Sequence, residues 1–195
     1  MSLIERLAIT YKERPELIRS TAEEIQNKIT QNEELLQANK SREDDVNNLS
    51  ARLLKQWEAN FDSEHGGEKG APKFPMPARL SAVYNAAILQ NHAAVKNQIH
   101  FTLKQMAAGG IYDQVGGGFA RYSVDSQWRV PHFEKMLYDN AQLTALYAKA
   151  TSIEQDEVFK MVVNESFDFL IREMEIEPGL FASAIDADSE GVEGK

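Results

Sequence analysis

Residues 109–143 read GGIYDQVGGGFARYSVDSQWRVPHFEKMLYDNAQL, and this stretch decides how the chain is organised. It contains five of the eleven glycines, as a pair at 109–110 and a triplet at 116–118. Glycine allows the backbone conformations that turns require, so no long helix is expected to cross these positions. The triplet lacks the spacing of the GxGxxG pattern, and the stretch therefore carries no dinucleotide-binding fingerprint.

The segments on either side of this stretch have the periodicity of amphipathic helices, with apolar residues every three or four positions. The predicted helices span 15–29, 46–61, 80–88, 95–106, 134–151 and 158–174. Pro131 fixes a turn, and the helix after it is predicted to begin near His132 or Phe133. This helix has little polar face, so we expect it to be covered on most sides. The pattern predicts an all-α fold.

Two short segments have the alternation of extended chain rather than of a helix. They are residues 119–124 and residues 180–185, and the second follows Pro178 and Gly179. Because both are short and lie outside the predicted helices, we expect them to pair with each other as a small β-hairpin-like element.

The composition is that of an ordinary globular domain. The chain has 195 residues, of which 43% are hydrophobic and 26% are charged, and this length is sufficient to bury a core. No apolar run approaches the roughly 20 residues that cross a bilayer, and the N-terminal segment lacks the features of a signal peptide. We therefore expect a cytoplasmic protein that does not associate with membranes. The absence of cysteine excludes disulfides and thiol catalysis.

The negative charge is concentrated in the last part of the chain. Residues 151–195 contain twelve acidic and three basic residues, which accounts for the whole net charge of −9. An acidic segment repels the phosphates of nucleic acids, so we expect no nucleic-acid partner.

Aromatic, cationic and carboxylate side chains are concentrated in and after the glycine-rich stretch, a combination common in sugar-binding and acid–base sites. We expect them to share one polar recess at the start of the helix that follows Pro131. The candidates for acid–base catalysis are His132, Glu134, Asp113 and Asp139. The candidates for contacts with a ligand are Arg121, Tyr122, Asp125, Trp128, Tyr138, Asp186 and Asp188.

The same stretch also allows a structural interpretation. Its glycines and Pro131 could simply connect two helices while its charges are solvated. Glu134 would then stabilise a helix N-terminus through the helix dipole, and Tyr138 would lie one turn further on. Both interpretations remain open at this point.

Three segments of the sequence carry a family resemblance. The glycine-rich stretch, APKFP at 71–75 and SAIDADSEGVEGK at 183–195 resemble the spermatogenesis-associated, thioredoxin-domain-containing protein family, over about residues 46–195. The resemblance implies a thioredoxin-like domain followed by a helical domain similar to the α/α toroid of six-hairpin glycosidases and N-acylglucosamine 2-epimerases.

The resemblance further implies that this chain is a fragment. The thioredoxin-like domain, with its CxxC pair, has no counterpart here, and the sequence ends within the DADSEG motif. We therefore expect residues 1–45 to be an N-terminal helical linker and residues 46–195 to be an incomplete α/α toroid, about half of a six-hairpin barrel. Faces left open in this way are expected to favour self-association.

No metal or other cofactor is expected. Asp186, Asp188, Glu190 and Gly191 match the opening of an EF-hand loop, but the glutamate of its twelfth position would fall beyond residue 195. His65 has no second histidine or cysteine at ligand spacing. Lys73, between two prolines, is expected to be exposed.

Three functions agree with these patterns, and the sequence leaves open whether the protein is an enzyme. The first is binding of a carbohydrate-like small molecule, with epimerisation or hydrolysis as the reaction if one occurs. The second is a non-catalytic helical scaffold, whose charges would be paired with one another. The third is a module that recognises substrates for a thioredoxin-like domain, for which an apolar groove would be needed.

Overall fold

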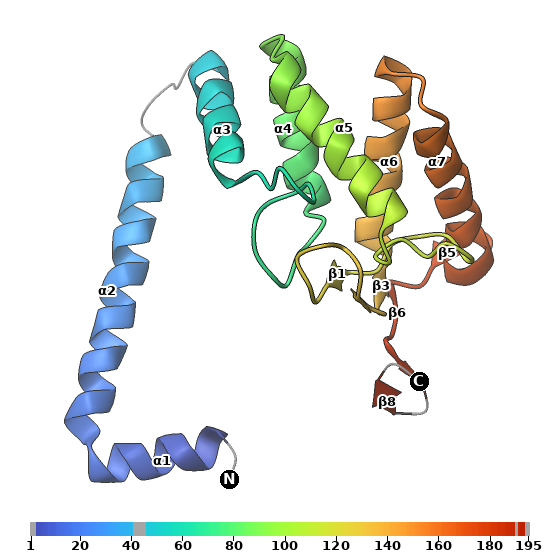
Figure 1. Ribbon diagram of the computed structural model, residues 1–195. Coiled ribbons are helices and arrows are strands. Elements are labelled where there is room, and N and C mark those ends of the chain that lie inside the picture. The colour runs from blue at the N-terminus through green and yellow to red at the C-terminus, as the bar shows by residue number, and fades with distance from the viewer. Residues whose placement is uncertain (1–2, 41–45, 190, 194–195) are drawn as a thin grey trace. The chain divides into compact units, whose positions relative to one another are not determined.

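The computed structural model spans residues 1–195 and describes residues 3–40, 46–189 and 191–193. The chain divides into two compact units, Met1–Asp45 and Val46–Lys195, which are described separately (Figure 1). No helix in the described part of the chain is long and apolar enough to cross a membrane. The third and fourth residues of the DADSEG motif, Asp188 and Ser189, are described, whereas Glu190 lies outside the described residues.

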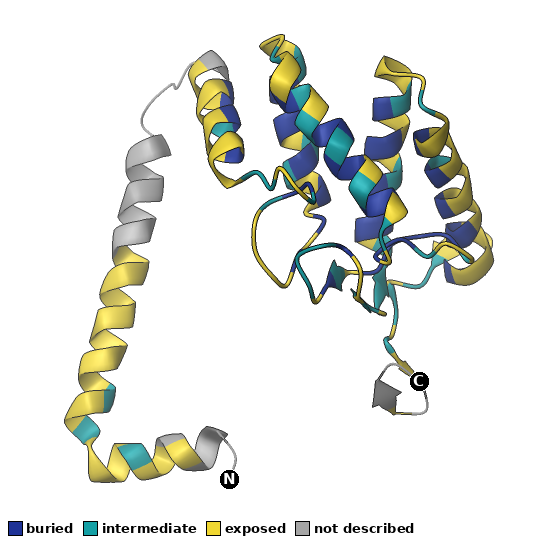
Figure 2. Cartoon of the chain, viewed as in Figure 1, coloured by how far each residue is buried: buried dark blue, intermediate teal, exposed yellow. Residues whose placement is uncertain are grey.

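The first unit consists of two helices, α1 (Leu3–Glu13) and α2 (Pro15–Lys40). Pro15 occupies the first position of α2, where its missing N–H is not needed. Arg14 separates the helices, and its carbonyl accepts a hydrogen bond from the backbone N–H of Leu17 at 3.1 Å. The described side chains of α2 are mostly exposed (Figure 2).

The second unit is built from helices that lie side by side in Figure 1. They are α3 (Val46–Asn60), α4 (Pro77–Leu89), α5 (Ala93–Ala108), α6 (Leu137–Ile153) and α7 (Glu157–Phe169), and a π-helical turn, η1 (Leu170–Met174), extends α7. Helix α4 packs against α3, α5 and α6, and α6 packs against α7. The mostly helical content confirms the all-α prediction.

Local sequence explains where these helices begin. Pro77 opens α4. The imidazole of His92 accepts a hydrogen bond from Val95 N at the start of α5, and the carboxylate of Asp156 accepts one from Val158 N at the start of α7. Asp156 also pairs with Lys104 of α5 at 2.7 Å, which ties the two helices together.

The core of the second unit lies between the facing sides of its helices (Figure 2). Large aromatic side chains fill much of it, including Trp57, Tyr84, Tyr147 and Phe159. Helix α6 was expected to be covered on most sides, but this is wrong, because Ala141, Ala145 and Ala148 are exposed. Alanine is apolar yet small enough to remain on a surface at little cost, so it does not mark burial reliably.

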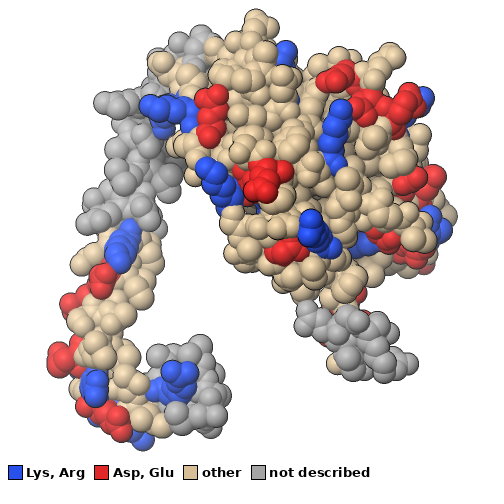
Figure 3. Space-filling view, in the orientation of Figure 1, with Lys and Arg blue, Asp and Glu red and all other residues tan. Residues whose placement is uncertain are grey.

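Charges of both signs are mixed on the surface of this unit. Figure 3 shows Lys and Arg side chains beside Asp and Glu side chains on the face in view. Arg79, for example, pairs with Glu68 at 2.8 Å. The apolar side chains of Phe167 in α7, Ile171 in η1 and Ile176 just after η1 are exposed. Self-association through such faces remains a prediction.

Short strands in the loops form antiparallel pairs. These pairs differ from the predicted one. Strand β1 (Tyr122–Ser123) pairs with β2 (Pro131–His132), β3 (Lys135–Met136) with β6 (Ala184–Ile185), β4 (Glu175–Glu177) with β5 (Leu180–Phe181), and β7 (Asp188–Ser189) with β8 (Val192–Glu193). The predicted pairing of 119–124 with 180–185 is therefore wrong. The first segment pairs instead with residues 131–132, and the second pairs with residues 135–136 and 175–177.

The helix after Pro131 begins at Leu137 rather than near His132 or Phe133, which corrects the predicted start. Residues 131–136 are instead held as extended chain by β1 on one side and β6 on the other. The backbone N–H of Leu137 then donates to Ser183 O at 3.0 Å. Glu134 consequently lies outside the helix rather than in its first turn, and its predicted one-turn spacing to Tyr138 does not apply.

Candidate functional site

Residues 109–119, which we call the glycine-rich loop, are shaped by close backbone contacts. A Cβ atom on Gly110 would lie 2.1 Å from the carbonyl oxygen of Arg129, and one on Gly117, whose φ is +76°, would lie 2.5 Å from the carbonyl oxygen of Glu165. No larger side chain fits at either position without displacing the backbone. The loop can therefore approach residues 129 and 165 only because it contains glycine.

Helix α6 fixes the end of this loop through one side chain. Oδ1 of the buried Asn140 accepts a hydrogen bond from Phe119 N at 2.6 Å, and its Nδ2 donates to Phe119 O at 3.0 Å. Phe119 also forms a β-bridge with Tyr112, which closes the loop on itself. The loop and the start of α6 thus form one rigid support.

Asp113 orders the tip of the loop. Its carboxylate accepts hydrogen bonds from Gly116 N at 2.8 Å and Val115 N at 3.0 Å, and it forms an ion pair with the ammonium of Lys135 at 2.8 Å. Burial acts to raise the pKa of Asp113, but the bonds from Gly116, Lys135 and Val115 outweigh it and lower the pKa to about 2. Asp113 is therefore ionised at neutral pH.

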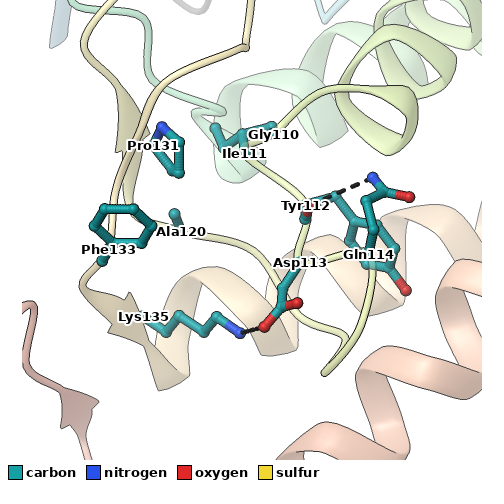
Figure 4. Close-up of a pocket in the computed structure, with 9 residues that line it drawn as sticks. All are labelled: Gly110, Ile111, Tyr112, Asp113, Gln114, Ala120, Pro131, Phe133 and Lys135. Atoms are coloured by element: carbon teal, nitrogen blue, oxygen red, sulfur yellow. Dashed lines mark hydrogen bonds and ion pairs between the residues drawn. The ribbon is translucent and has the colours of Figure 1, made fainter. Parts of the chain in front are cut away.

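A cavity of about 350 Å³ lies beside this ion pair, and we call it the Asp113 cavity (Figure 4). Its lining residues are Gly110, Ile111, Tyr112, Asp113, Gln114, Ala120, Pro131, Phe133 and Lys135. Figure 4 shows Pro131 and Phe133 on one side, facing the residues of the glycine-rich loop, with Lys135 reaching across to Asp113. Most of the wall is apolar, and the polar groups are gathered at one end.

A second, smaller cavity of about 230 Å³ shares part of this wall. Asp113, Phe133 and Lys135 line both spaces, and the second is completed by Gly116, Phe169, Arg172, Glu173 and Ile185. The ammonium of Lys135 also lies 4.4 Å from the centre of the Phe169 ring and donates to Gly117 O at 2.9 Å. Lys135 therefore separates the two cavities and is held from several sides.

The extended residues 131–136 divide the predicted site into two faces. Successive side chains of extended chain point to opposite sides, and Pro131, Phe133 and Lys135 line the Asp113 cavity. His132 and Glu134 point away from it. The predicted single recess is therefore wrong: of the eleven candidate residues, Asp113 alone lines this cavity.

The opposite face holds several of the other candidates. The rings of Tyr122 and His132 are stacked, with centroids 4.7 Å apart, and Phe74 lies 4.8 Å from Tyr122. Arg121 pairs with Glu134 at 2.8 Å. None of these residues lines either described cavity. Tyr138, at the start of α6, is exposed.

Asp139 is the most perturbed acid of this face. It lies in the first turn of α6 and is 8% exposed. Burial raises the pKa of Asp139 to about 6, because the attraction of Arg121 compensates only in part and the charge of Glu134 adds to the rise. A carboxyl group in this state can gain or lose a proton near neutral pH.

Trp128 and Asp125 have structural positions. Trp128 is 1% exposed, and its indole N–H donates to His65 O at 2.9 Å, so its ring is not available for stacking on a ligand. The carboxylate of Asp125 accepts hydrogen bonds from Gln127 N at 2.6 Å and Val130 N at 2.6 Å. Burial acts to raise the pKa of Asp125, but these backbone bonds outweigh it and lower the pKa. Both residues shape the loop rather than a recess.

Lys73, expected to be exposed, is buried, which corrects that prediction. Its ammonium pairs with Asp62 at 2.6 Å, donates to Ser126 O at 3.0 Å and lies 5.1 Å from the centre of the Trp128 ring. The two prolines around Lys73 keep this segment extended, so that it can bridge to Ser123. A buried lysine is stable here because its charge is paired with that of Asp62.

The acids near the C-terminus do not reach the Asp113 cavity. Asp186 and Asp188 are exposed, and Asp188 N donates to the Asp186 carboxylate at 3.4 Å. Their neighbour Ile185 lines the smaller cavity. No group of three or more His, Asp or Glu residues suited to a metal ion occurs in the described part of the chain.

Sequence reasoning missed most of the residues that line the Asp113 cavity. Lys135, Phe133 and Gln114 were not candidates, although Pro131, Phe133 and Lys135 are spaced two apart, as on one face of a strand. That signal was hidden by the prediction that a helix begins near His132.

Comparison with known proteins gives a consistent group of relatives. No family model matches the chain. The chain is 42% identical over 145 residues to spermatogenesis-associated protein 20 of Rattus norvegicus, covering 72% of this chain and 18% of that protein. It is 42% identical over 154 residues to the Homo sapiens protein of the same name, covering 77% and 19%. An uncharacterised protein of Caenorhabditis elegans is 42% identical over 139 residues, covering 68% and 19%.

The chain thus spans less than a fifth of the length of these relatives. The aligned region covers most of this chain but only one segment of each relative. These comparisons support the resemblance to the spermatogenesis-associated protein family.

Proposed function

We propose that residues 46–195 form part of an α/α toroid, with residues 1–45 as a helical linker, and that the Asp113 cavity binds a small carbohydrate-like ligand. One observation carries the proposal: a cavity of about 350 Å³ that combines apolar walls with an ion pair at one end. Small-molecule sites typically have volumes of roughly 300–1,000 Å³ and a few polar groups on a mainly apolar lining.

The lining suits the two kinds of surface on a sugar ring. The side chains of Pro131 and Phe133 offer apolar contact to the C–H face of the ring. The ionised Asp113 can accept hydrogen bonds from hydroxyl groups, and Lys135 can donate them. A ligand with one apolar face and one hydroxylated edge would therefore satisfy both ends of the cavity.

The proposed activity at this cavity is binding rather than catalysis. A carboxyl group whose pKa is about 2 transfers protons poorly at neutral pH, because it is a very weak base. Asp139, whose pKa is about 6, is better suited to proton transfer, but it does not line the cavity. Epimerisation or hydrolysis at this cavity would need a proton donor or acceptor other than Asp113.

A non-catalytic scaffold is the second candidate function. Two ion pairs favour it, because they leave these charged side chains bound to one another: Asp113 with Lys135, and Arg121 with Glu134. The presence of an open cavity disfavours it. The same apolar wall would also suit a side chain of a protein substrate, as a recognition module for a thioredoxin-like domain would require.

Ligand binding is tested by titrating the 195-residue chain with neutral and N-acetylated mono- and disaccharides, followed by calorimetry and saturation-transfer NMR. We expect at least one sugar to bind, and Phe133→Ala to weaken it about tenfold through loss of ring contact. Phe167→Ala is the matched control, because Phe167 is 58% exposed and Phe133 is 59% exposed, and Phe167 lies outside the cavity.

Two results would contradict the proposal. The first is that no sugar of the panel binds, which would leave the scaffold as the better explanation. The second is that Phe133→Ala and Phe167→Ala weaken binding equally, because the sugar would then bind elsewhere.

A further inference from the structure

The smaller cavity adjoins the Asp113 cavity. Its volume of about 230 Å³ is below the roughly 300–1,000 Å³ of typical small-molecule sites, so it is too small to serve as such a site by itself. The two cavities have the side chains of Asp113, Phe133 and Lys135 in common. Phe133 is 59% exposed, so this shared wall reaches the surface. The smaller cavity is therefore better explained as an extension of the Asp113 cavity.

The smaller cavity is built by segments that do not line the Asp113 cavity. Lys135 and Ile185 are paired residues of β3 and β6, and paired residues of antiparallel strands share a face, so Ile185 continues the wall that Lys135 begins. Arg172 and Glu173 come from η1, the π-helical turn that extends α7. π-Helical turns are rare, and they often occur at functional sites. A second set of apolar and polar groups therefore lies next to the first.

Lys135 is a fixed divider between the two cavities. Its ammonium pairs with Asp113 at 2.8 Å, donates to Gly117 O at 2.9 Å and lies 4.4 Å from the centre of the Phe169 ring. A group that is held from three directions does not move aside easily, so one large ring cannot fill both spaces. Two smaller rings joined by a narrow linkage can fill them, with the linkage passing over the exposed Phe133.

The charges around the two cavities are balanced pair by pair. Asp113 pairs with Lys135 at 2.8 Å, and Glu173 pairs with Arg172 at 2.7 Å. A phosphate or carboxylate group could bind either cation only by displacing its acid, whose charge would then remain beside the ligand and repel it. Hydroxyl groups carry no charge, and they can exchange hydrogen bonds with these groups without breaking either ion pair. The balance therefore favours a neutral ligand.

We propose that the two cavities are adjacent subsites for the two rings of a neutral disaccharide unit. This inference rests on the function proposed above, because it assigns the first ring to the Asp113 cavity. The second ring lies in the smaller cavity, with apolar contact to Ile185 and hydrogen bonds from Arg172. The guanidinium of Arg172 donates from Nε to Glu173 and from Nη2 to Gly116 O, and since a guanidinium has five N–H groups it can donate to ring hydroxyls as well.

Calorimetric titration of the 195-residue chain tests the size and charge of the ligand. The probes are glucose, galactose, mannose and N-acetylglucosamine, and disaccharides of the same sugars: maltose, cellobiose, lactose, mannobiose and N,N′-diacetylchitobiose. We expect at least one disaccharide to bind at least tenfold more tightly than either of its monosaccharides, because its two rings are linked and fill both subsites. Glucuronic and galacturonic acid should bind no more tightly than glucose and galactose, because the acids of the site repel their charge.

Arg172→Met tests the second subsite. Because Arg172 lines the smaller cavity and not the Asp113 cavity, the variant should reduce the affinity for that disaccharide about tenfold. Its affinity for the monosaccharides should be unchanged, which also shows that the variant is folded. Arg129→Met is the matched control: Arg129 is exposed and lines neither cavity, so both affinities should be unchanged.

Different results would overturn the inference and the function on which it rests. If neither a monosaccharide nor a disaccharide of the panel binds, both are overturned. If a monosaccharide binds but no disaccharide binds more tightly, or if Arg172→Met does not weaken the disaccharide selectively, the Asp113 cavity is a single site and only the second subsite is overturned. Tighter binding of a uronic acid than of its neutral sugar would show that the ligand is not neutral.

Discussion

Asn140 is hydrogen-bonded to both backbone groups of Phe119, although the two residues are 21 positions apart: Oδ1 accepts from Phe119 N at 2.6 Å and Nδ2 donates to Phe119 O at 3.0 Å. The Asn140 amide thus makes with Phe119 the two hydrogen bonds that a neighbouring strand would otherwise make. Nδ2 also donates to Met136 O at 2.9 Å, just before α6 begins. One side chain therefore joins the glycine-rich loop, the extended segment and the helix that together surround the Asp113 cavity.

Replacement of Asn140 should be strongly destabilising. Asn140→Ala leaves the buried N–H and C=O of Phe119 without these partners, and each buried unsatisfied group costs roughly 1–3 kcal/mol. We expect a loss of about 2–4 kcal/mol in the free energy of unfolding, measured by urea denaturation. Gln142→Ala, an exposed change on the same helix, is the control and should have little effect. A loss below about 1 kcal/mol for Asn140→Ala would show that the loop is held by other contacts.

The close approach of the loop to Arg129 gives a second prediction. In Gly110→Ala the new Cβ would lie 2.1 Å from Arg129 O, a backbone atom that cannot easily move. We expect a loss of more than about 2 kcal/mol in the free energy of unfolding, the size seen for overpacked sites. The change should also reduce the volume available for ligands, because Gly110 lines the cavity.

Gly179→Ala separates this steric effect from backbone strain. Gly179 has a φ of +82° but no atom within 4 Å of its hypothetical Cβ, so its substitution reports the conformational cost alone, of the order of 1 kcal/mol. If Gly179→Ala were as destabilising as Gly110→Ala, the contact with Arg129 would not be the cause.

The helices could be predicted from the sequence because their signal is local. Apolar spacing placed α3, α4, α5 and α7 close to their observed bounds, and α2 begins at Pro15 as predicted. Each of these segments buries one face against a neighbour, so its periodicity records its packing. The start of α6 could not be placed in this way.

The site depends on contacts between distant segments, and these leave no periodic signal. Lys135 would lie in a helix by its own propensity, yet pairing with Ile185 keeps it in a strand, and strand geometry directs it to Asp113. Trp128, chosen as a ligand platform because it is aromatic, is instead covered by the segment around His65. Residue type indicated which chemistry was present, whereas tertiary pairing decided which groups share a face.

The ion pair of Asp113 and Lys135 should be visible in acid titrations. The pKa of Asp113 is lowered from 3.8 to about 2 in the folded protein, so its ionised form stabilises the fold above about pH 4, and this contribution is lost as the pH falls towards 2. Lys135→Met removes one of the bonds that lower the pKa. We therefore expect the carboxyl ¹³C resonance of Asp113 to titrate at higher pH in this variant.

Lys160→Met provides the comparison for this titration, because Lys160 is an exposed lysine of α7 outside both cavities. It should leave the midpoint of Asp113 unchanged. An Asp113 midpoint that is the same in Lys135→Met and in the unsubstituted chain would mean that the backbone bonds from Gly116 and Val115 alone hold the pKa down.

Asp139 should have the opposite effect on stability, because its pKa is raised. The pKa of Asp139 increases from 3.8 in the unfolded chain to about 6 in the fold, so the folded state binds the proton more tightly. Between these values the stability falls as the pH rises, and the full penalty is present above about pH 6. Asp139→Asn removes this penalty. Relative to the unsubstituted chain, the variant should gain roughly 1–3 kcal/mol more at pH 8 than at pH 4.

Urea denaturation at pH 4 and pH 8 measures this difference, and Asp168→Asn, at an exposed acid of α7, is the control for the change of one charge. A gain for Asp139→Asn that is equal at both pH values would show that folding does not raise the pKa of Asp139. A gain confined to pH 8 would mean that the fold maintains, beside Arg121 and Glu134, a carboxyl group that costs stability. Such a cost is typical of groups that transfer protons, and it would direct the search for a reaction to this face rather than to the Asp113 cavity.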